Sequence, residues 1–418
     1  MKITIGLSLS LTGQYAAMGR QAETAIRLFV TDANASSALR VAGERCEFAL
    51  DCHDDASDPA RCAEIYRALS ADSRADVIFG PYSSQLTRTA AEIVERAGRL
   101  FVNHGGAGDE LYDHGYRMVV GVLSPASEYL RGYVQLLTQL KLWRKRVAIV
   151  ASKSPFGRAV ASGFERTAAE RAARRRGVRV RVKWNGTFDP ASTPDRLFPA
   201  LIRNRVNAVV SAGSYEHDLA VMRAVAQSRL SIPVLGCVAA GVRRFGSDLG
   251  ELSEGIVGPS QWEDSVELDP LLGPTPAEFA RRMRRAGCAD TPDYPAAQVY
   301  AAGLLTAAAL AAAGTCDSAR LREAFSDLRT TTMFGEFAID RVTGRQVGHQ
   351  MLLVQWYRGR KVIIEPESHD DSGSLDLPSG VHLLLAGVDL LRLNRRDDSI
   401  ESLSDTSDDT EDDERRHD

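Results

Sequence analysis

The stretch Lys2-Ile3-Thr4-Ile5-Gly6-Leu7, followed by Ser8-Leu9-Ser10-Leu11-Thr12-Gly13, indicates the fold of this 418-residue chain. The first six residues are β-prone, and the next six supply hydroxyl groups and a flexible backbone. Apolar residues then recur at helical spacing up to Asn34. A strand, a turn and an amphipathic helix in this order are typical of an open α/β sheet, in which ligands bind at the carboxyl ends of strands. The hydroxyl-rich turn, with Ser10, is therefore the first candidate ligand site.

The same strand, loop and helix pattern recurs along residues 1–366. Short apolar runs predict buried parallel strands at 46–50, 77–80, 100–103, 147–150, 208–211 and 234–236. Apolar residues three and four apart predict helices at 60–69, 85–97, 126–140, 157–174, 193–204, 215–228 and 295–313. Asp58-Pro59 is a favourable helix start, because aspartate caps free amides and proline fits the first turn. Repeated βαβ units favour right-handed parallel sheets, and residues 334–364 predict a β-rich close with a hairpin around Arg358-Gly359.

Charge divides the chain into two unlike parts. Residues 367–418 contain sixteen acidic and five basic residues, a net charge of -11, which leaves +7 on the first 366 residues of a chain whose total is -4. Residues 399–418 are nearly all polar or charged and predict a disordered acidic tail. The extension 367–398 contains an apolar run, Val381–Leu391, that is half the length of a membrane span and is interrupted by Asp389, so we expect a short docked helix there.

The sequence lacks the characteristic motifs of several classes of enzyme and of cofactor-binding protein. There is no G-x-S-x-G elbow, no phosphate-binding G-x-x-x-x-G-K-S/T loop and no G-x-G-x-x-G after the first strand, so we expect no enzyme activity and no cofactor. Asp54, Asp55 and Asp58 could suggest a metal, but helix capping is sufficient to explain them. The basic run from Arg171 to Lys183 has no interleaved aromatic residues, which favours a solvated face over a nucleic-acid partner.

Cysteine content and hydropathy add two further expectations. The six cysteines show no C-x-x-C spacing, so we expect buried thiols, with a Cys52–Cys62 disulfide left open for an oxidising compartment. No run of about 18 apolar residues marks a membrane span, so direct membrane insertion is not expected.

Five segments together carry a family resemblance: Ile5–Asn34, Asp54–Pro59, Gly80–Ser84, Asn103–Leu111 and Phe334–Pro366. In order and spacing they resemble the branched-chain amino-acid-binding (leucine-binding) proteins of ABC importers, which are type I periplasmic solute-binding proteins. The resemblance implies an α/β fold of two Rossmann-like lobes with parallel sheets, joined by three crossing strands near 122, 258 and 332. Lobe 1 would comprise residues 1–121 and 259–331, and lobe 2 residues 122–258 and 332–366.

The same resemblance implies a function. An amino acid or a related small amide or carboxylate would be held between the lobes, the lobes would close on it, and an ABC permease would read the closed form. In the first lobe, Ser83 and Ser84, preceded by Tyr82, match the serines that receive the ligand carboxylate, and Ser84 is favoured when the segment is aligned without gaps. Both serines could instead cap the helix that begins near Gln85.

The next loop, Asn103–Ala107, matches a segment whose backbone carbonyl and threonine usually meet the ligand. Ala107 replaces that threonine, and Gly105 and Gly106 would keep the backbone accessible. His104 is expected to be structural or to lie at the rim of the site rather than to act as a base.

In the second lobe, Phe156 with Gly157 matches an aromatic–glycine pair, and Ser214 with Tyr215 falls where a tyrosine commonly closes the site. The family's acidic residue for the ligand ammonium would fall at Val238, which has no charge. Another acid would then replace it, or the ligand lacks an ammonium; the acids considered are Glu216, Glu263 and Asp264. Trp262 could instead supply an aromatic wall.

Compartment leaves two functions open. Met1 is followed directly by the first predicted strand, with no basic n-region, apolar core or cleavage site. A transport role, periplasmic by resemblance, therefore requires a leader upstream of this sequence. The alternative is a cytoplasmic ligand-sensing regulator on the same fold, similar to the amide sensors.

Overall fold

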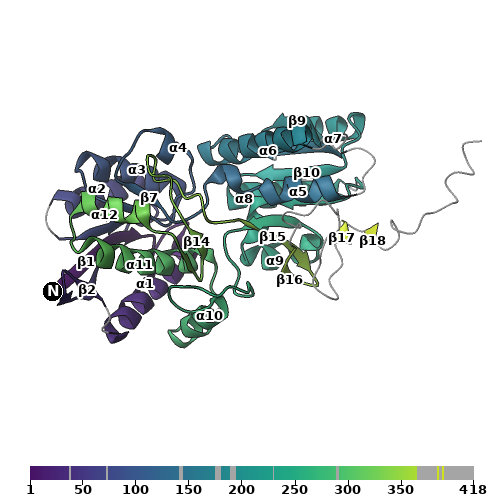
Figure 1. Cartoon of the computed structure of the whole chain (residues 1–418). Coiled ribbons are helices and arrows are strands. Elements are labelled where there is room, and N and C mark those ends of the chain that lie inside the picture. Colours follow the sequence, from purple (N-terminus) through teal and green to yellow (C-terminus); the bar gives the residue numbers. More distant parts are fainter. Residues whose placement is uncertain are drawn as a thin grey trace, which may run out of the picture.

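The computed structural model describes residues 1–36, 39–71, 74–140, 145–174, 180–188, 194–228, 230–288, 291–364, 384–385 and 388–389. Two lobes lie side by side, and the chain passes between them more than once (Figure 1). We call the unit on the five-stranded sheet the first lobe and the unit on the seven-stranded sheet the second lobe.

The first lobe has a parallel five-stranded sheet between two layers of helices. In spatial order its strands are β4 (Glu47–Asp54), β1 (Lys2–Leu9), β5 (Val77–Phe79), β6 (Phe101–Asn103) and β7 (Val119–Gly121). Its helices are α1 (Ala16–Ser36), α2 (Pro59–Ala71), α3 (Ser84–Arg96), α4 (Glu110–Asp113), α10 (Pro276–Arg285), α11 (Tyr294–Ala313) and α12 (Ser318–Asp327). Two short hairpins complete it, β2 (Arg40–Val41) with β3 (Glu44–Arg45) and β13 (Thr330–Thr332) with β14 (Gly335–Phe337).

Side-chain alternation explains the two helical layers of the first lobe. Ile3, Ile5 and Leu7 on one face of β1 join the apolar cluster of α1 and α11. Ile78 and Phe101, on the opposite face, join the cluster of α2 and α3. A strand that is buried on both faces reads as a continuous apolar run, as β5 does, whereas β1 places small or hydroxyl-bearing residues between its apolar ones.

The second lobe has a seven-stranded mixed sheet. In spatial order its strands are β16 (Arg360–Ile363), β15 (Leu352–Tyr357), β12 (Val257–Ser260), β11 (Val234–Cys237), β10 (Ala208–Ala212), β8 (Lys145–Ala151) and β9 (Val180–Gly186), with β15 and β16 antiparallel to their neighbours. Its helices are α5 (Arg131–Gln139), α6 (Pro155–Arg174), α7 (Pro194–Arg203), α8 (Tyr215–Gln227) and α9 (Arg244–Leu249), with the 3-10 turns η1 (Ala126–Glu128), η2 (Val238–Gly241) and η3 (Gly250–Ser253).

The strands fix where the chain passes between the lobes. The first crossing follows β7, close to the expected position at 122. Because β12 belongs to the second sheet up to Ser260, the second crossing follows that residue rather than 258. The hairpin β13–β14 lies outside the second sheet, and its Phe337 packs against Phe325 of α12 at 6.1 Å between ring centroids, so the third crossing comes between β14 and β15 rather than at 332.

The three crossings are tied together by a buried hydrogen-bond network. Ser124 N donates to Gln261 Oε1 at 3.2 Å, and Gln261 Nε2 donates to Ser124 O at 3.0 Å. The ring of His349 lies between them, with Nδ1 2.6 Å from Ser124 Oγ and Nε2 3.0 Å from Gln261 O. Phe334 stacks on this ring at 4.4 Å and 12°. We call Ser124, Gln261 and His349 the hinge network.

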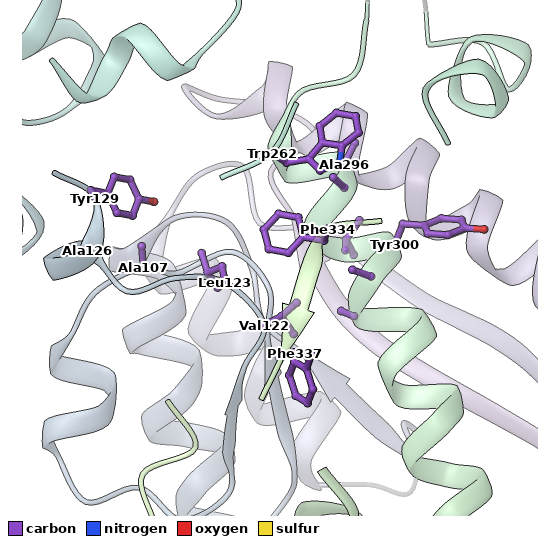
Figure 2. Packing of buried hydrophobic residues seen from close by; sticks show 14 of the residues in the cluster. Ala107, Val122, Leu123, Ala126, Tyr129, Trp262, Ala296, Tyr300, Phe334 and Phe337 are labelled. Atoms are coloured by element: carbon purple, nitrogen blue, oxygen red, sulfur yellow. The ribbon is translucent and has the colours of Figure 1, made fainter. Parts of the chain in front are cut away.

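An apolar cluster continues from one lobe to the other beside the hinge network. Figure 2 shows part of it, with Val122 and Leu123 from the first crossing near Phe334 and Phe337 of the β13–β14 hairpin, and Trp262 from the second crossing nearby. The structure therefore joins the lobes through packed side chains as well as through the chain itself.

Several sequence expectations need comment. Leu384–Leu385 and Val388–Asp389 pair as short antiparallel strands, so the expected helix is wrong at these four residues, whereas the tail 399–418 lies outside the described residues. All six cysteines are free thiols: Cys52 is near Glu23 and Arg27 of α1 and Cys62 Sγ is 3.7 Å from Leu86 O of α3, so the disulfide is not formed.

Helix α11 is long and apolar enough to cross a membrane by length and composition. Of its apolar window, 67% is buried, since the helix packs against α1 in the core of the first lobe. Burial inside the fold explains its composition.

Candidate functional site

Aromatic rings from both lobes gather at the boundary between them. In the first lobe, the hydroxyls of Tyr82 and Tyr294 lie 2.8 Å apart, and Tyr15 packs edge-on against Tyr82 at 5.7 Å. Beyond the first crossing, Tyr129 packs edge-on against Phe156 at 5.4 Å. Burial raises the pKa of Tyr82 to about 12, and burial together with the neighbouring Tyr82 raises the pKa of Tyr129. The boundary therefore presents neutral aromatic surface at physiological pH.

An ionic group lies at the same boundary and consists of the buried Glu263, Asp293 and Lys361 and the partly exposed Arg243 and Asp264. Lys361 Nζ is 2.6 Å from Glu263 Oε1 and 3.6 Å from Asp293 Oδ1. Arg243 NH2 is 2.7 Å from Asp264 Oδ1 and 3.2 Å from Glu263 Oε2, and Arg243 N donates to Asp293 Oδ2 at 3.0 Å. Burial raises the pKa of Glu263, although Lys361 opposes this effect. Asp293 precedes α11 of the first lobe, so the group joins the two lobes.

The serine pair before α3 has one hydroxyl without a partner. Ser83 occupies the N-cap position, but its side chain makes no capping hydrogen bond. Its Oγ is buried and unpartnered. The capping alternative is therefore wrong for Ser83, and its hydroxyl is available to a ligand. Both residues lie at the N-terminus of α3, where free backbone amides favour an anion.

The glycine loop after β6 is more closed than expected. Asn103 Oδ1 accepts from the backbone amides of Gly105 (3.2 Å) and Gly106 (2.9 Å), so these amides are already used. A Cβ on Gly105 would lie 2.2 Å from Pro81 O, which shows that the glycine is needed for packing against the Tyr82–Ser84 segment. Ala107 is 5% exposed. The expectation of an accessible backbone is thus wrong for the amides, and the loop serves to support the serine segment.

His104, in the same loop, is fully enclosed. It is 1% exposed, and burial lowers its pKa to about 4. It is therefore a structural residue and not a rim residue.

Of the ligand contacts expected in the second lobe, only Phe156 interacts with another ring at the aromatic boundary. Phe156, in the first turn of α6, packs against Tyr129. Ser214 caps α8 by accepting from His217 N, and Tyr215 donates to Asp248 Oδ2 at 2.8 Å, so both are already engaged within the second lobe. Val238 begins η2 and is partly buried against the apolar cluster.

The substitute acids considered for the ligand ammonium are already paired. Glu216 is exposed and lies 3.4 Å from Arg244, whereas Glu263 and Asp264 bind Arg243 in the ionic group. Trp262 is 2% exposed, and its Nε1 donates to the backbone carbonyl of Met333 at 2.9 Å. It therefore lies inside the apolar cluster beside the hinge network and not on an open wall (Figure 2).

Ser10 has a structural partner. Its hydroxyl donates to Asp55 Oδ1 at 2.6 Å, and both residues are fully buried. Asp58 Oδ1 accepts from Arg61 N, which confirms the predicted helix start. Among the described residues, no three or more His, Cys, Asp or Glu side chains are placed so that they could hold a metal ion.

Sequence reasoning missed Tyr15, Tyr129, Tyr294 and Asp293. The signal for Asp293 was present, since Asp293-Tyr294-Pro295 has the pattern of a helix start, but that pattern suggests a cap and hides a buried carboxylate. Tyr15 and Tyr294 contact Tyr82 within the first lobe, whereas Tyr129 lies beyond the first crossing, and these long-range contacts cannot be inferred from spacing alone.

A separate concavity lies away from the boundary. Its volume is about 480 Å³, and it is lined by side chains of α1, α10 and α11, among them Phe29, Asp32, Arg282, Tyr300 and Leu304. Its charges are mutually paired, because Asp32 accepts from both Arg282 and Tyr300.

Comparison with known proteins agrees with this architecture. A family model described as "Periplasmic binding protein" matches residues 2–361. The leucine-, isoleucine-, valine-, threonine- and alanine-binding protein of Pseudomonas aeruginosa is 22% identical over 363 residues, which cover 85% of this chain and 90% of that protein.

Solved structures share the fold. An ABC transporter substrate-binding protein from Desulfitobacterium hafniense in complex with Leu has a TM-score of 0.72 at 18% identity, covering 87% of this chain and 100% of that one. A solute-binding protein of an ABC transporter from R. palustris in complex with 4-hydroxybenzoate has a TM-score of 0.71 at 17% identity, covering 87% of this chain and 96% of that one.

Proposed function

The chain belongs to the periplasmic binding protein family, and from this premise we propose that it captures a small carboxylic acid between its lobes and delivers it to an ABC permease. The relatives that it matches are solute-binding proteins of ABC transporters and not enzymes. Their family is periplasmic, and we propose the same compartment for this chain. The comparisons do not support the alternative of a cytoplasmic ligand-sensing regulator.

The observation that carries the proposal is the Ser83 hydroxyl. A buried hydroxyl without a partner costs free energy, so it is retained where a ligand completes its hydrogen bonding. Its place at the N-terminus of α3 suits a carboxylate, which accepts from the hydroxyl and from the helix amides. The tyrosines and Phe156 at the boundary then suit the apolar part of the ligand.

The ligands of two similar solved structures support a carboxylate as the group that this chain binds. Leucine and 4-hydroxybenzoate, bound by the two solved relatives, share a carboxylate and an apolar body. We propose that Ser83 and Ser84 receive the carboxylate in this chain, with Tyr82, Phe156 and neighbouring rings around the body.

Calorimetric titration tests the function. We expect at least one of L-leucine, L-alanine, benzoate and 4-hydroxybenzoate to bind the full-length chain saturably. Ser83→Ala should weaken that binding about tenfold, because one hydrogen bond to a charged group is lost. Ser247→Ala, at an exposed serine of α9, is the matched control and should bind as the wild type does. Lack of binding to every acid in the panel, or chemical conversion of a bound acid, would contradict the proposal.

A further inference from the structure

We propose that the carboxylate of Asp293 binds the ammonium group of the ligand, so that the captured acid is an amino acid. This inference rests on the proposed function, since it assigns a second anchor within the same boundary. It concerns a residue that neither the resemblance nor the sequence pattern placed in the site.

The first support is the hydrogen-bond arrangement of Asp293. The residue is 4% exposed. One oxygen, Oδ2, accepts from Arg243 N at 3.0 Å. The other, Oδ1, is buried and has no hydrogen-bond partner, its nearest described charge being Lys361 Nζ at 3.6 Å. A carboxylate oxygen without a donor is incomplete, and an ammonium N–H is a donor that completes it.

Lys361 does not already fill this role. Its Nζ lies 2.6 Å from Glu263 Oε1 and donates to Gly241 O at 2.6 Å. These two short contacts use two of the three donors of the ammonium, and its contact with Asp293 Oδ1 is an ion pair without a hydrogen bond. Its distance to Asp293 Oδ1 exceeds that of a hydrogen bond.

Charge gives a second, independent support. The ionic group contains three carboxylates, Glu263, Asp264 and Asp293, and two cations, Arg243 and Lys361, so it has one more negative charge than positive. Solvent screens Arg243 and Asp264, which are 31% and 29% exposed. The buried members are two carboxylates and one ammonium, and their excess negative charge is costly to bury. The ammonium of a bound amino acid would bring the total to zero. Val238, the position where the resemblance expects an acid, contributes no charge.

The neighbouring rings supply a third support. Tyr294 follows Asp293 in the chain and bonds to Tyr82 through the hydroxyls at 2.8 Å. Tyr82 is followed directly by Ser83, the proposed carboxylate anchor. Asp293 and Ser83 are therefore connected through the Tyr294–Tyr82 contact, so the two proposed anchors belong to the same part of the boundary.

Asp293 is held by the first lobe and touches the second. Its backbone N donates to Gln21 Oε1 of α1 at 2.8 Å, whereas its side chain meets Arg243 of the second lobe. A ligand bound to this carboxylate would therefore be sensed by both lobes, which is what closure on a ligand requires.

The test compares amino acids with their deaminated analogues. The probes are L-leucine with 4-methylpentanoate and L-phenylalanine with 3-phenylpropanoate, titrated into the full-length chain by calorimetry. The variant is Asp293→Asn, which keeps an oxygen for Arg243 N. It also leaves the start of α11 intact, because the Asp293 side chain makes no capping bond to its own helix.

Asp264→Asn is the matched control. It removes a carboxylate from the same ionic group, but its described partner is Arg243 alone, and it is 29% exposed. Thermal unfolding of each variant verifies that the chain is folded.

We expect the wild type to bind an amino acid at least about tenfold more tightly than its deaminated analogue. Asp293→Asn should weaken amino-acid binding about 10- to 100-fold and leave the deaminated acid within about threefold of wild type, so that the preference disappears. Asp264→Asn should keep the preference.

Three results overturn the assignment. If the wild type binds the deaminated acids or benzoate as tightly as it binds amino acids, the site at the boundary accepts acids without an ammonium. The proposed function then stands and this inference fails. If amino acids are preferred and Asp293→Asn keeps that preference, another group binds the ammonium. If no acid of either class binds, the proposed function fails as well.

Discussion

Ser10 and Ser83 are serines of neighbouring strand-end turns in the first lobe, yet their hydroxyls are in opposite situations. The Ser10 hydroxyl binds the buried carboxylate of Asp55 at 2.6 Å, and Ser8 binds the other oxygen of Asp55 at 2.7 Å. The Ser83 hydroxyl has no partner. The sequence predicted both as ligand contacts, because residue type and position after a strand are the same. The difference lies in Asp55, some 45 residues along the chain from Ser10.

Ser10→Ala should therefore act on stability and not on binding. Loss of a buried hydrogen bond to a charged group should lower the free energy of unfolding by about 2 kcal/mol. Denaturant unfolding at pH 7 measures this effect, and calorimetry with the acid that the wild type binds should give an affinity within about threefold of wild type.

Ser83→Ala is the comparison variant at the same scale. Removing an unpartnered buried hydroxyl also removes its desolvation cost, so the free energy of unfolding should stay the same or rise by up to about 2 kcal/mol. A large loss of affinity in Ser10→Ala, with an unchanged unfolding free energy, would show that Ser10 belongs to the ligand site after all.

Among the strands and helices, the hairpin β15–β16 is one whose turn could be predicted from the sequence. The expected turn at Arg358-Gly359 is confirmed, with φ of 50° at Arg358 and 69° at Gly359. Two consecutive residues with positive φ form the two-residue turn that suits the twist of a hairpin. Glu254 accepts from both backbone amides of the turn and fixes it to the second lobe.

Gly359→Ala tests this turn. A Cβ at Gly359 would meet no atom within 4 Å, so the cost is conformational and not steric. Because an L-residue in the left-handed region loses about 1 kcal/mol or more, the free energy of unfolding should fall by about 1 kcal/mol. Denaturant unfolding measures it, with Gly132→Ala as a helical control without positive φ. An unchanged midpoint would contradict the left-handed backbone at Gly359.

Helices and strands could be predicted from the sequence where a single local pattern determines them. The parallel strands at 77–80, 208–211 and 234–236 are confirmed because they are buried on both faces and read as apolar runs. The segment 381–391 has the same apolar character, and the structure gives short strands at 384–385 and 388–389 instead of the expected helix. A short apolar run does not distinguish a strand from a buried helix by periodicity.

The proposed ligand site at the boundary was less predictable from the sequence than the helices and strands that form it. Ser83 could be found because it follows a strand and precedes a helix, which are local features. Asp293 and Tyr129 come from different lobes. They reach the same boundary only because the folded chain places the start of α11 beside the first crossing. Long-range contacts of this kind leave no periodicity in the chain.

At the scale of the whole molecule, the hinge network relies on a neutral histidine. His349 Nε2 donates to Gln261 O, which leaves Nδ1 to accept from Ser124 Oγ. Burial lowers the pKa of His349 to about 4, from an ordinary value near 6.5. Protonation would place a second donor opposite the Ser124 hydroxyl and a charge beside Phe334. A charged ring would therefore weaken the connection between the lobes.

The pH dependence of stability follows from this depressed pKa. Between pH 6.5 and pH 4 the unfolded chain binds a proton at His349 that the folded chain does not, so stability falls as pH falls through this window and is unaffected by this residue above it. Each such proton contributes a slope of about 1.4 kcal/mol per pH unit. His104, whose pKa is also lowered to about 4 by burial, adds a second contribution of the same sign.

His349→Gln separates the hinge contribution from the rest. The variant should be less stable than wild type at pH 7.5, since the stacking on Phe334 is lost, yet its stability should fall less steeply between pH 6.5 and pH 4, by about 1.4 kcal/mol per pH unit at most. Urea unfolding at several pH values measures both quantities, and His114→Gln, at an exposed histidine, should keep the wild-type slope. A wild-type slope in His349→Gln would mean that the hinge ring titrates alike in the folded and unfolded chain, which its burial between three crossings opposes.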